Sequence, residues 1–297
     1  MDAQGLAVAD GGLETVMVFK EGIDLPHFAA FPLIYEERGR AALRHYYEGF
    51  LAVADDAGLP YVLDTPTWRA SPDWAARLEF SKAELARANA DAVAFVRGLA
   101  GERADVTLEG VVGPRADGYV VADRMGPDEA AEYHSPQMAV FRDEGVDRVC
   151  AVTLNYVGEA LGFVHAAIDL GVPAVVSFTV ETDGRLPDGT GLREAIMQVD
   201  AATTGAAEFY MVNCAHPRHV ALGLGDAVTA DRVRGIRVNA SALSHAELDA
   251  AEELDEGDPA QLASDNATLR RLLPNVQVLG GCCGTDARHV RAMISSW

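Results

Sequence analysis

The chain has 297 residues, and 49% of them are hydrophobic, which is enough to bury a large core. Its formal net charge at pH 7 is −21, with 45 acidic residues against 24 basic ones. A surface of that sign repels nucleic acid and anionic membranes, so we expect neither as a partner. We expect no secretory signal at the N-terminus and no membrane helix, because no apolar run reaches ~18 residues. Four cysteines, two of them adjacent, form a poor disulfide framework and predict a cytoplasmic protein whose thiols serve chemistry or metal.

Short β-rich segments alternate along the chain with longer segments of helical periodicity. We predict eight strands, at residues 6–10, 61–65, 106–112, 148–153, 174–179, 208–213, 236–239 and 276–280. Helical spacing is clearest at residues 36–57, 82–99, 128–144, 159–170, 192–204, 259–273 and 286–295. Several strands are apolar throughout, as is typical of parallel strands covered on both faces. Eight βα units predict a (β/α)8 TIM barrel that uses residues 1–297 as one domain, with a doubly wound open sheet as the alternative.

Polar side chains gather where the predicted strands end, and in a TIM barrel those C-terminal ends form the face that carries the chemistry. The polar residues there are Asp10, Asp64, Thr65, Thr67, Glu181, Asp183, Asn213, Cys214, Asn239, Cys282 and Cys283. Only one strand separates strands six and eight. We therefore expect the loops that carry the three cysteines of this set to meet over the mouth of the barrel.

Three cysteines on a barrel rim match a catalytic zinc site, which has three protein ligands and one open position. Flanking glycines at 280, 281 and 284 let the backbone bend so that two adjacent thiols face one ion. We predict Zn²⁺ on Cys214, Cys282 and Cys283. Two alternatives stay open: buried free thiols, and a redox or disulfide pair of Cys282 and Cys283 that leaves Cys214 without a role. Cys150 lies within an apolar strand, where packing is its expected role.

Three thiolate ligands donate so much charge that zinc becomes a poor activator of water. They suit a softer task, which is to bind a fourth thiol from a substrate. A free thiol has a pKa of ~8.5, and binding to a metal removes its proton. The resulting thiolate can attack an electrophilic methyl group without a general base beside it. His216, close to Cys214, therefore needs no catalytic role.

Motifs along essentially the whole chain resemble those of the zinc-dependent homocysteine S-methyltransferases, whose members include enzymes that use betaine or S-methylmethionine. The motifs are DGG at 10–12, TPTWRAS at 65–71, VGP at 112–114, EA at 159–160, SFT at 177–179, NC at 213–214 and GGCC at 280–283. The last two together are the most specific. The resemblance implies a (β/α)8 barrel and zinc on the three matching cysteines. It also implies methyl transfer from a sulfonium or ammonium donor to homocysteine, which forms methionine.

The resemblance assigns acceptor contacts to particular residues and leaves one gap. Asp10 of the DGG motif is expected to bind the amino-acid acceptor, and Asn213 of the NC motif to contact substrate. The family has a second acceptor-binding carboxylate, a glutamate, at the end of strand four, where this sequence has Val152. Glu181, or Asp183 beside it, is the expected substitute because both follow the neighbouring strand.

The donor side also departs from the family pattern. Trp68 stands where the family has an aromatic residue near the donor, and a ring face attracts a cation by ~1–2 kcal/mol once both are desolvated. Arg69 replaces a tyrosine linked to betaine binding, and its charge disfavours a quaternary ammonium donor. Arg115 is a candidate partner for a substrate carboxylate, with a surface ion pair as the alternative.

Together these observations lead to one main hypothesis. The chain is predicted to be a zinc-dependent enzyme that transfers a methyl group from S-methylmethionine or S-adenosylmethionine to the thiol of homocysteine. Its expected partners are these small molecules. The alternatives are the same chemistry on another thiol or selenol, and a barrel that binds zinc or a thiol without turnover. The sequence leaves the donor, the true acceptor and the oligomeric state open.

Overall fold

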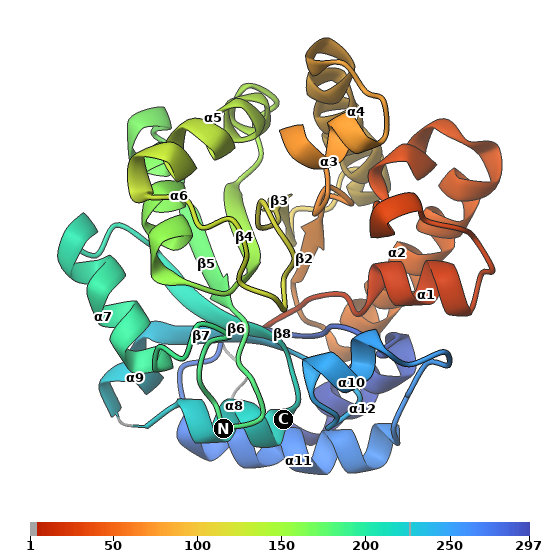
Figure 1. Ribbon diagram of the computed structural model, residues 1–297. Coiled ribbons are helices and arrows are strands. Elements are labelled where there is room, and N and C mark those ends of the chain that lie inside the picture. The colour runs from red at the N-terminus through yellow and green to blue at the C-terminus, as the bar shows by residue number, and fades with distance from the viewer. Residues whose placement is uncertain (1–4, 226) are drawn as a thin grey trace.

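The computed structural model describes residues 5–225 and 227–297. The expectation that the N-terminus carries no secretory signal falls partly on residues outside this range. Eight parallel strands form a closed barrel in chain order, with β8 bonded to β1 (Figure 1). The TIM barrel prediction is therefore confirmed, and the open-sheet alternative is wrong. The strands are β1 (Ala7–Val8), β2 (Tyr61–Asp64), β3 (Val106–Val112), β4 (Arg148–Leu154), β5 (Ala174–Phe178), β6 (Phe209–Ala215), β7 (Val233–Val238) and β8 (Val278–Gly281).

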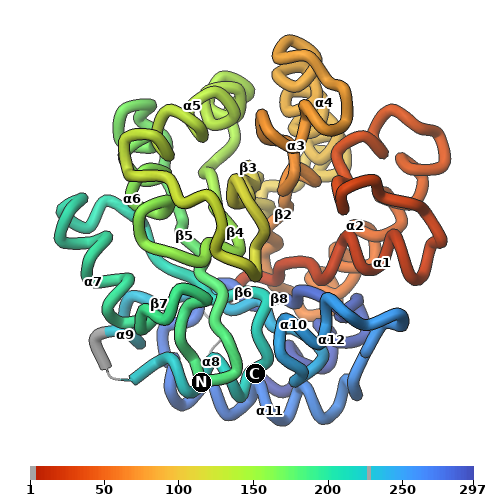
Figure 2. The backbone as a smooth tube through the Cα atoms, viewed as in Figure 1, coloured from red at the N-terminus to blue at the C-terminus, as the bar shows by residue number. Residues whose placement is uncertain are grey.

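Helices surround the barrel, as the backbone trace shows (Figure 2). They are α1 (Leu13–Phe19), α2 (Glu37–Ala57), α3 (Pro72–Arg77), α4 (Lys82–Ala100), α5 (Pro127–Asp143), α6 (Val157–Leu170), α7 (Leu192–Thr203), α8 (Pro217–Gly223), α9 (Ala227–Arg232), α10 (His245–Asp249), α11 (Pro259–Leu272) and α12 (Ala287–Ser296). Two short 3₁₀ helices, η1 (Pro26–Phe28) and η2 (Phe31–Tyr35), precede α2. Among the described residues, no helix has both the length and the apolar character needed to cross a bilayer.

The seven helices predicted from periodicity are all present within one or two residues of their expected ends. Those that the sequence missed, α1, α3, α8, α9 and α10, have between five and seven residues each. A helix of two turns or less shows too few repeats for its periodicity to stand out. Strand β7 begins at Val233, three residues before the predicted start at 236. The prediction began too late because arginines interrupt the apolar pattern of this strand.

The barrel interior holds an apolar layer that includes Val62, Val111, Cys150 and Met211. The Cys150 side chain is fully buried there, as expected for a packing residue. A charged group lies within the same interior: Arg148 Nε donates to Glu109 Oε1 at 2.5 Å. Because a buried charge needs a partner of opposite sign, this ion pair neutralises charge within the barrel.

Candidate active site

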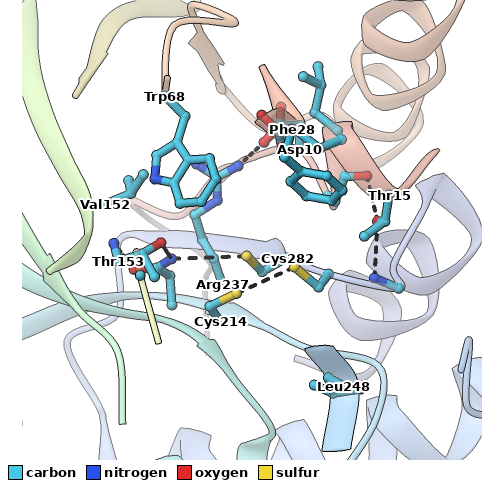
Figure 3. A pocket seen from close by; sticks show the side chains of 18 of the residues that line it. Asp10, Thr15, Phe28, Trp68, Val152, Thr153, Cys214, Arg237, Leu248 and Cys282 are labelled. Carbon is cyan, nitrogen blue, oxygen red and sulfur yellow. Dashed lines mark hydrogen bonds and ion pairs between the residues drawn. The ribbon is translucent and has the colours of Figure 1, made fainter. Parts of the chain in front are cut away.

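The three cysteines of the NC and GGCC motifs meet at the C-terminal mouth of the barrel (Figure 3). Cys214 lies in β6, and Cys282 and Cys283 directly follow β8. The sulfur atoms of Cys214 and Cys283 are 3.5 Å apart, and all three sulfurs lie within 4.8 Å of one another. Thiolates at ~2.3 Å from a tetrahedral ion are roughly 3.8 Å apart, so the spacing fits a metal bound by three sulfurs. Among the described residues, no other cluster of three potential ligands has this geometry.

Cys214 reaches this position through an irregularity in its strand. The pairing of β6 with β7 shifts register between Asn213 and Ala215, and Cys214 has a φ of 56°. A bulge of this kind turns a side chain away from the regular pleat. The carbonyl of Cys214 accepts hydrogen bonds from Thr179 Oγ1 at 3.3 Å and from His245 Nε2 at 2.8 Å. The threonine of the SFT motif therefore helps to hold the cysteine in its unusual conformation.

Asn213 lines the cavity, and its side chain links three neighbouring strand ends. Its Oδ1 accepts from Ser177 Oγ at 2.6 Å and from the backbone N–H of Thr153 at 2.9 Å. Its Nδ2 donates to Thr153 Oγ1 at 2.8 Å and faces Cys282 Sγ at 3.9 Å. Thr153 has a φ of 64°, which is rare for a β-branched residue and needs such support. These bonds give Asn213 a positioning role, and the substrate contact expected of it stays a prediction.

Glycines allow the DGG and GGCC segments to approach closely. A side chain on Gly12 would place its Cβ 2.6 Å from the carbonyl oxygen of Cys282, and one on Gly280 would lie 2.7 Å from that of Asp10. Of the three glycines that flank the cysteine pair, only Gly284 adopts a left-handed conformation, with φ of 79°. All three glycines were expected to let the backbone bend. Gly280 and Gly281 instead leave room for a neighbouring segment, because a side chain at either position would collide with it.

A cavity of about 390 Å³ opens above the sulfur cluster, a volume in the range of small-molecule sites. It collects most of the residues that the sequence proposed for the site. The predicted residues on its wall are Asp10, Trp68, Asn213, Cys214, Cys282 and Cys283, together with Val152 and Arg69. Helices α1 and α10, which periodicity did not reveal, supply part of the rim through Glu14 and Leu248.

Glu181 and Arg115 do not line this cavity. Glu181 Oε1 lies 2.9 Å from His245 Nδ1, and it therefore orients the ring whose other nitrogen contacts Cys214. The chain turns back after β5 through a hydrogen bond between the Glu181 N–H and the Arg185 carbonyl, which keeps this side chain off the cavity wall. The role of Glu181 as an acceptor ligand stays a prediction. Asp183 caps the same turn by accepting from the Arg185 N–H at 3.0 Å. Arg115 forms ion pairs with two acidic residues, Asp73 and Glu129, each at 2.8 Å.

Tyr119, which sequence reasoning missed, lies directly against the sulfur cluster. Its hydroxyl is 3.1 Å from Cys214 Sγ and 3.5 Å from Cys283 Sγ. Its ring stacks on His245 at 4.0 Å, with only 12° between the planes. Burial raises the pKa of Tyr119, and the neighbouring cysteines add to that effect. The only sequence signal was its place in the loop after the third strand, at the functional face of the barrel.

Arg237 was also missed, and it changes the interpretation of Asp10. Its guanidinium lies at the end of β7 and forms ion pairs with Asp10 and with Asp64. Figure 3 shows Arg237 beside Asp10. All three side chains are at least nine-tenths buried. Burial lowers the pKa of Arg237 to about 10, so it stays charged at neutral pH. Asp10 is on the cavity wall as expected, but its carboxylate is already paired.

The charge of Arg237 also reaches the cysteines. The pKa of the Cys282 thiol is lowered, chiefly by hydrogen bonds from Cys214 and Cys283, with a further contribution from Arg237. The pKa of Cys214 is raised by hydrogen bonding to the same two thiols and by burial. A thiolate is the form in which cysteine binds a metal, and the positive charge of Arg237 favours that form of Cys282.

The wall around Trp68 carries a second buried arginine. The guanidinium of Arg69 lies 4.1 Å from the ring centre of Trp68 and 3.7 Å from that of Trp74. One face of Trp68 is therefore already covered by a cation. Burial lowers the pKa of Arg69 to about 10, which still leaves it charged. Glu14 faces the same region, and burial raises the pKa of its carboxyl to about 7.

Comparison with known proteins agrees with this geometry. The family model for homocysteine S-methyltransferase matches residues 7–296, whereas a search of curated proteins found no match. The metallated form of the homocysteine methyltransferase MmuM from Escherichia coli has a TM-score of 0.76 and 18% identity, over 99% of this chain and 97% of that one. Its apo form has a TM-score of 0.68 and 19% identity, over 100% and 97%. The likeness in structure shows a common fold, and the family match spans nearly the whole sequence. The chain is therefore a methyltransferase that belongs to the homocysteine S-methyltransferase family.

Proposed function

We propose that this enzyme uses zinc to transfer a methyl group from a sulfonium donor to the sulfur of a small thiol. Homocysteine is the first acceptor to test because family membership supports it, and methionine is then the product. The observation that supports this proposal is the convergence of three cysteine sulfurs on the wall of one cavity. Zinc at this cluster, held by Cys214, Cys282 and Cys283, would keep the acceptor sulfur deprotonated at neutral pH.

The chemistry places few demands on the other side chains. The acceptor loses its proton, a new bond forms between its sulfur and the methyl carbon, and the bond from that carbon to the sulfonium sulfur breaks. The donor leaves as a neutral thioether and needs no general acid. The chain must therefore orient two substrates, exclude water and meet the donor's positive charge. Glu14 suits the last task, because it lines the cavity and forms no ion pair with any described residue.

A sulfonium donor fits this cavity better than betaine does. Recognition of a quaternary ammonium uses open aromatic faces. Here Arg69 covers a face of Trp68, so that face is closed to a trimethylammonium group. We expect S-methylmethionine or S-adenosylmethionine to give higher rates than betaine when all three are compared at equal concentration with one acceptor. Betaine as the best donor would refute this assignment.

The zinc assignment is tested by metal content and activity together. We expect about one zinc per chain in the wild-type protein. Replacing Cys214, Cys282 or Cys283 by Ser should remove most of that zinc and abolish methyl transfer. Cys150→Ser is the matched control, because this buried thiol lies in the interior apolar layer and should affect stability alone. Full zinc occupancy in the Cys282→Ser protein contradicts the assignment.

A second candidate keeps the chemistry and changes the acceptor to another thiol or selenol. Two observations favour it. Val152 is on the cavity wall where the family resemblance implies a carboxylate, and Asp10 is engaged by Arg237. Rates with homocysteine and with other small thiols, measured with the same donor, distinguish the two candidates.

A further inference from the structure

Two buried arginines line the cavity, and they differ in how completely their charges are neutralised. Arg237 contacts two carboxylates, those of Asp10 and Asp64. Arg69 is 5% exposed, yet its closest carboxylate oxygen belongs to the half-exposed Asp117, at 3.6 Å. The Arg69 Nη1 donates to the carbonyl of Ala116 at 2.9 Å, while its Nε has no acceptor among the described residues. Arg69 is therefore a buried cation with an incomplete set of partners.

The region beside the sulfur cluster is poorly suited to an ammonium group. Arg237 pairs with Asp10, and its Nε donates to the carbonyl of Gly281, the residue before Cys282, at 3.4 Å. An acceptor whose amino group approached Asp10 would place a second cation next to the guanidinium. Val152 supplies only a methyl surface to the same cavity. Glu14 lines the cavity as well, but the proposed function assigns its carboxylate to the positive charge of the donor.

Arg69 is, by contrast, well prepared to receive a carboxylate. The indole rings of Trp68 and Trp74 hold the plane of its guanidinium and shield it from water. A planar guanidinium in a dry environment binds a carboxylate through two parallel hydrogen bonds, and little conformational freedom is lost when it is already fixed. Arg69 lines the same cavity as the cysteines of the sulfur cluster.

We propose that this enzyme recognises its thiol acceptor through a carboxylate bound by Arg69 and makes no favourable contact with an amino group. The preferred acceptor class is a small thiol that bears a carboxylate and no ammonium group. Homocysteine is then accepted through its carboxylate alone. This inference rests on the proposed function, because it takes the sulfur cluster as the place where the acceptor sulfur binds.

Three thiols with the same three-carbon chain next to sulfur test the proposal: homocysteine, 4-mercaptobutyrate, which lacks its amino group, and 3-aminopropane-1-thiol, which lacks its carboxylate. Binding of each to the zinc-loaded protein is measured by calorimetry without a methyl donor, so that no donor carboxylate can contribute. We expect 4-mercaptobutyrate to bind at least as tightly as homocysteine. We expect 3-aminopropane-1-thiol to bind at least about tenfold more weakly, the effect of losing a charged hydrogen bond.

Variants assign the effect to Arg69. Arg69→Gln should weaken the binding of both carboxylate-bearing thiols at least tenfold. It should leave the affinity for 3-aminopropane-1-thiol unchanged. Arg77→Gln is the matched control, because Arg77 stacks on the same Trp74 ring at 4.3 Å but is exposed and does not line the cavity. It should leave the order of the three thiols unaltered. If Arg69→Gln fails to fold, the three wild-type affinities decide the matter.

Each result has one meaning. Tenfold tighter binding of homocysteine than of 4-mercaptobutyrate overturns the proposal, and so does an equal effect of Arg69→Gln on all three thiols. Absence of binding by all three to a zinc-loaded protein overturns it as well. A protein that takes up no zinc and methylates none of the thiols contradicts the proposed function itself. Methylation with the amino group preferred contradicts this inference alone.

Discussion

The cavity has a cysteine wall, formed by Cys214, Cys282 and Cys283, and an arginine wall, formed by Arg69 and Arg237. The cysteine wall is supported by uncharged hydrogen bonds, such as that from Thr179 to the Cys214 carbonyl. The arginine wall depends on full charges out of contact with water, and Arg237 is neutralised by carboxylates from two other strands or their loops. The difference indicates that changes to the cysteine wall should affect chemistry first. Changes to the arginine wall should affect stability and substrate choice together.

The largest effect on stability is expected from Arg237→Met. It leaves the Asp10 carboxylate buried beside an apolar side chain, and removing one partner of a buried ion pair in this way costs ~3–5 kcal/mol. Denaturant unfolding measures the loss. The double variant Asp10→Asn with Arg237→Met should recover part of it, because the stranded charge is gone. A loss below ~1 kcal/mol for the single variant would mean that Arg237 does not neutralise this carboxylate.

Glu14→Gln tests how the stability of the charged side of the cavity depends on pH. The pKa of Glu14 is raised from 4.5 to about 7 in the folded chain, mainly by burial. Between those values the folded state holds a proton that the unfolded state has lost, so the stabilising contribution is complete below pH 4.5 and disappears as pH rises through 7. The variant should therefore gain stability relative to the wild type between pH 5 and 8, by ~1–3 kcal/mol. Equal pH profiles of the melting temperature in both proteins contradict this.

Tyr119→Phe probes the approach to the cysteine wall. The variant loses the hydroxyl that contacts Cys214 and Cys283 and retains the ring stacked on His245. If the hydroxyl lies where an incoming thiol must enter, the variant keeps its metal and binds the acceptor up to about fivefold more tightly, since one hydrogen bond contributes ~1 kcal/mol. Metal content and thiol affinity provide the measurement. Loss of metal in this variant would instead make the hydroxyl part of the metal site.

Glu181→Ala should have the smallest effect on substrate. The carboxylate lies outside the cavity, so acceptor affinity should stay within about twofold of the wild type. Stability should fall by roughly 0.5–1.5 kcal/mol, because His245 loses a hydrogen bond at 2.9 Å. Acceptor titration and thermal unfolding of the same preparation separate the two. A tenfold rise in the acceptor dissociation constant would restore Glu181 as a substrate ligand.

Several features of the fold could be predicted because they depend on local pattern. The longer helices have enough turns for their apolar periodicity to be visible, and buried parallel strands are apolar runs of the expected length. The convergence of the cysteines followed from the same reasoning, since parallel strands in a closed barrel end on one face. Short helices such as α1 and α10 were missed because tertiary packing, more than their own sequence, stabilises them.

The sequence by itself determined the barrel, the three sulfurs on its mouth and the family to which the chain belongs, because each depends on residue type and spacing along the chain. Only the tertiary structure showed that Arg237 forms an ion pair with Asp10, that Arg69 contacts two indole rings, and that Glu181 contacts His245. The sequence around a charged residue contains no pattern that identifies the residue with which it will pair. Partners are set by which side chains a fold buries together, because a buried charge must be neutralised by whatever group lies within reach.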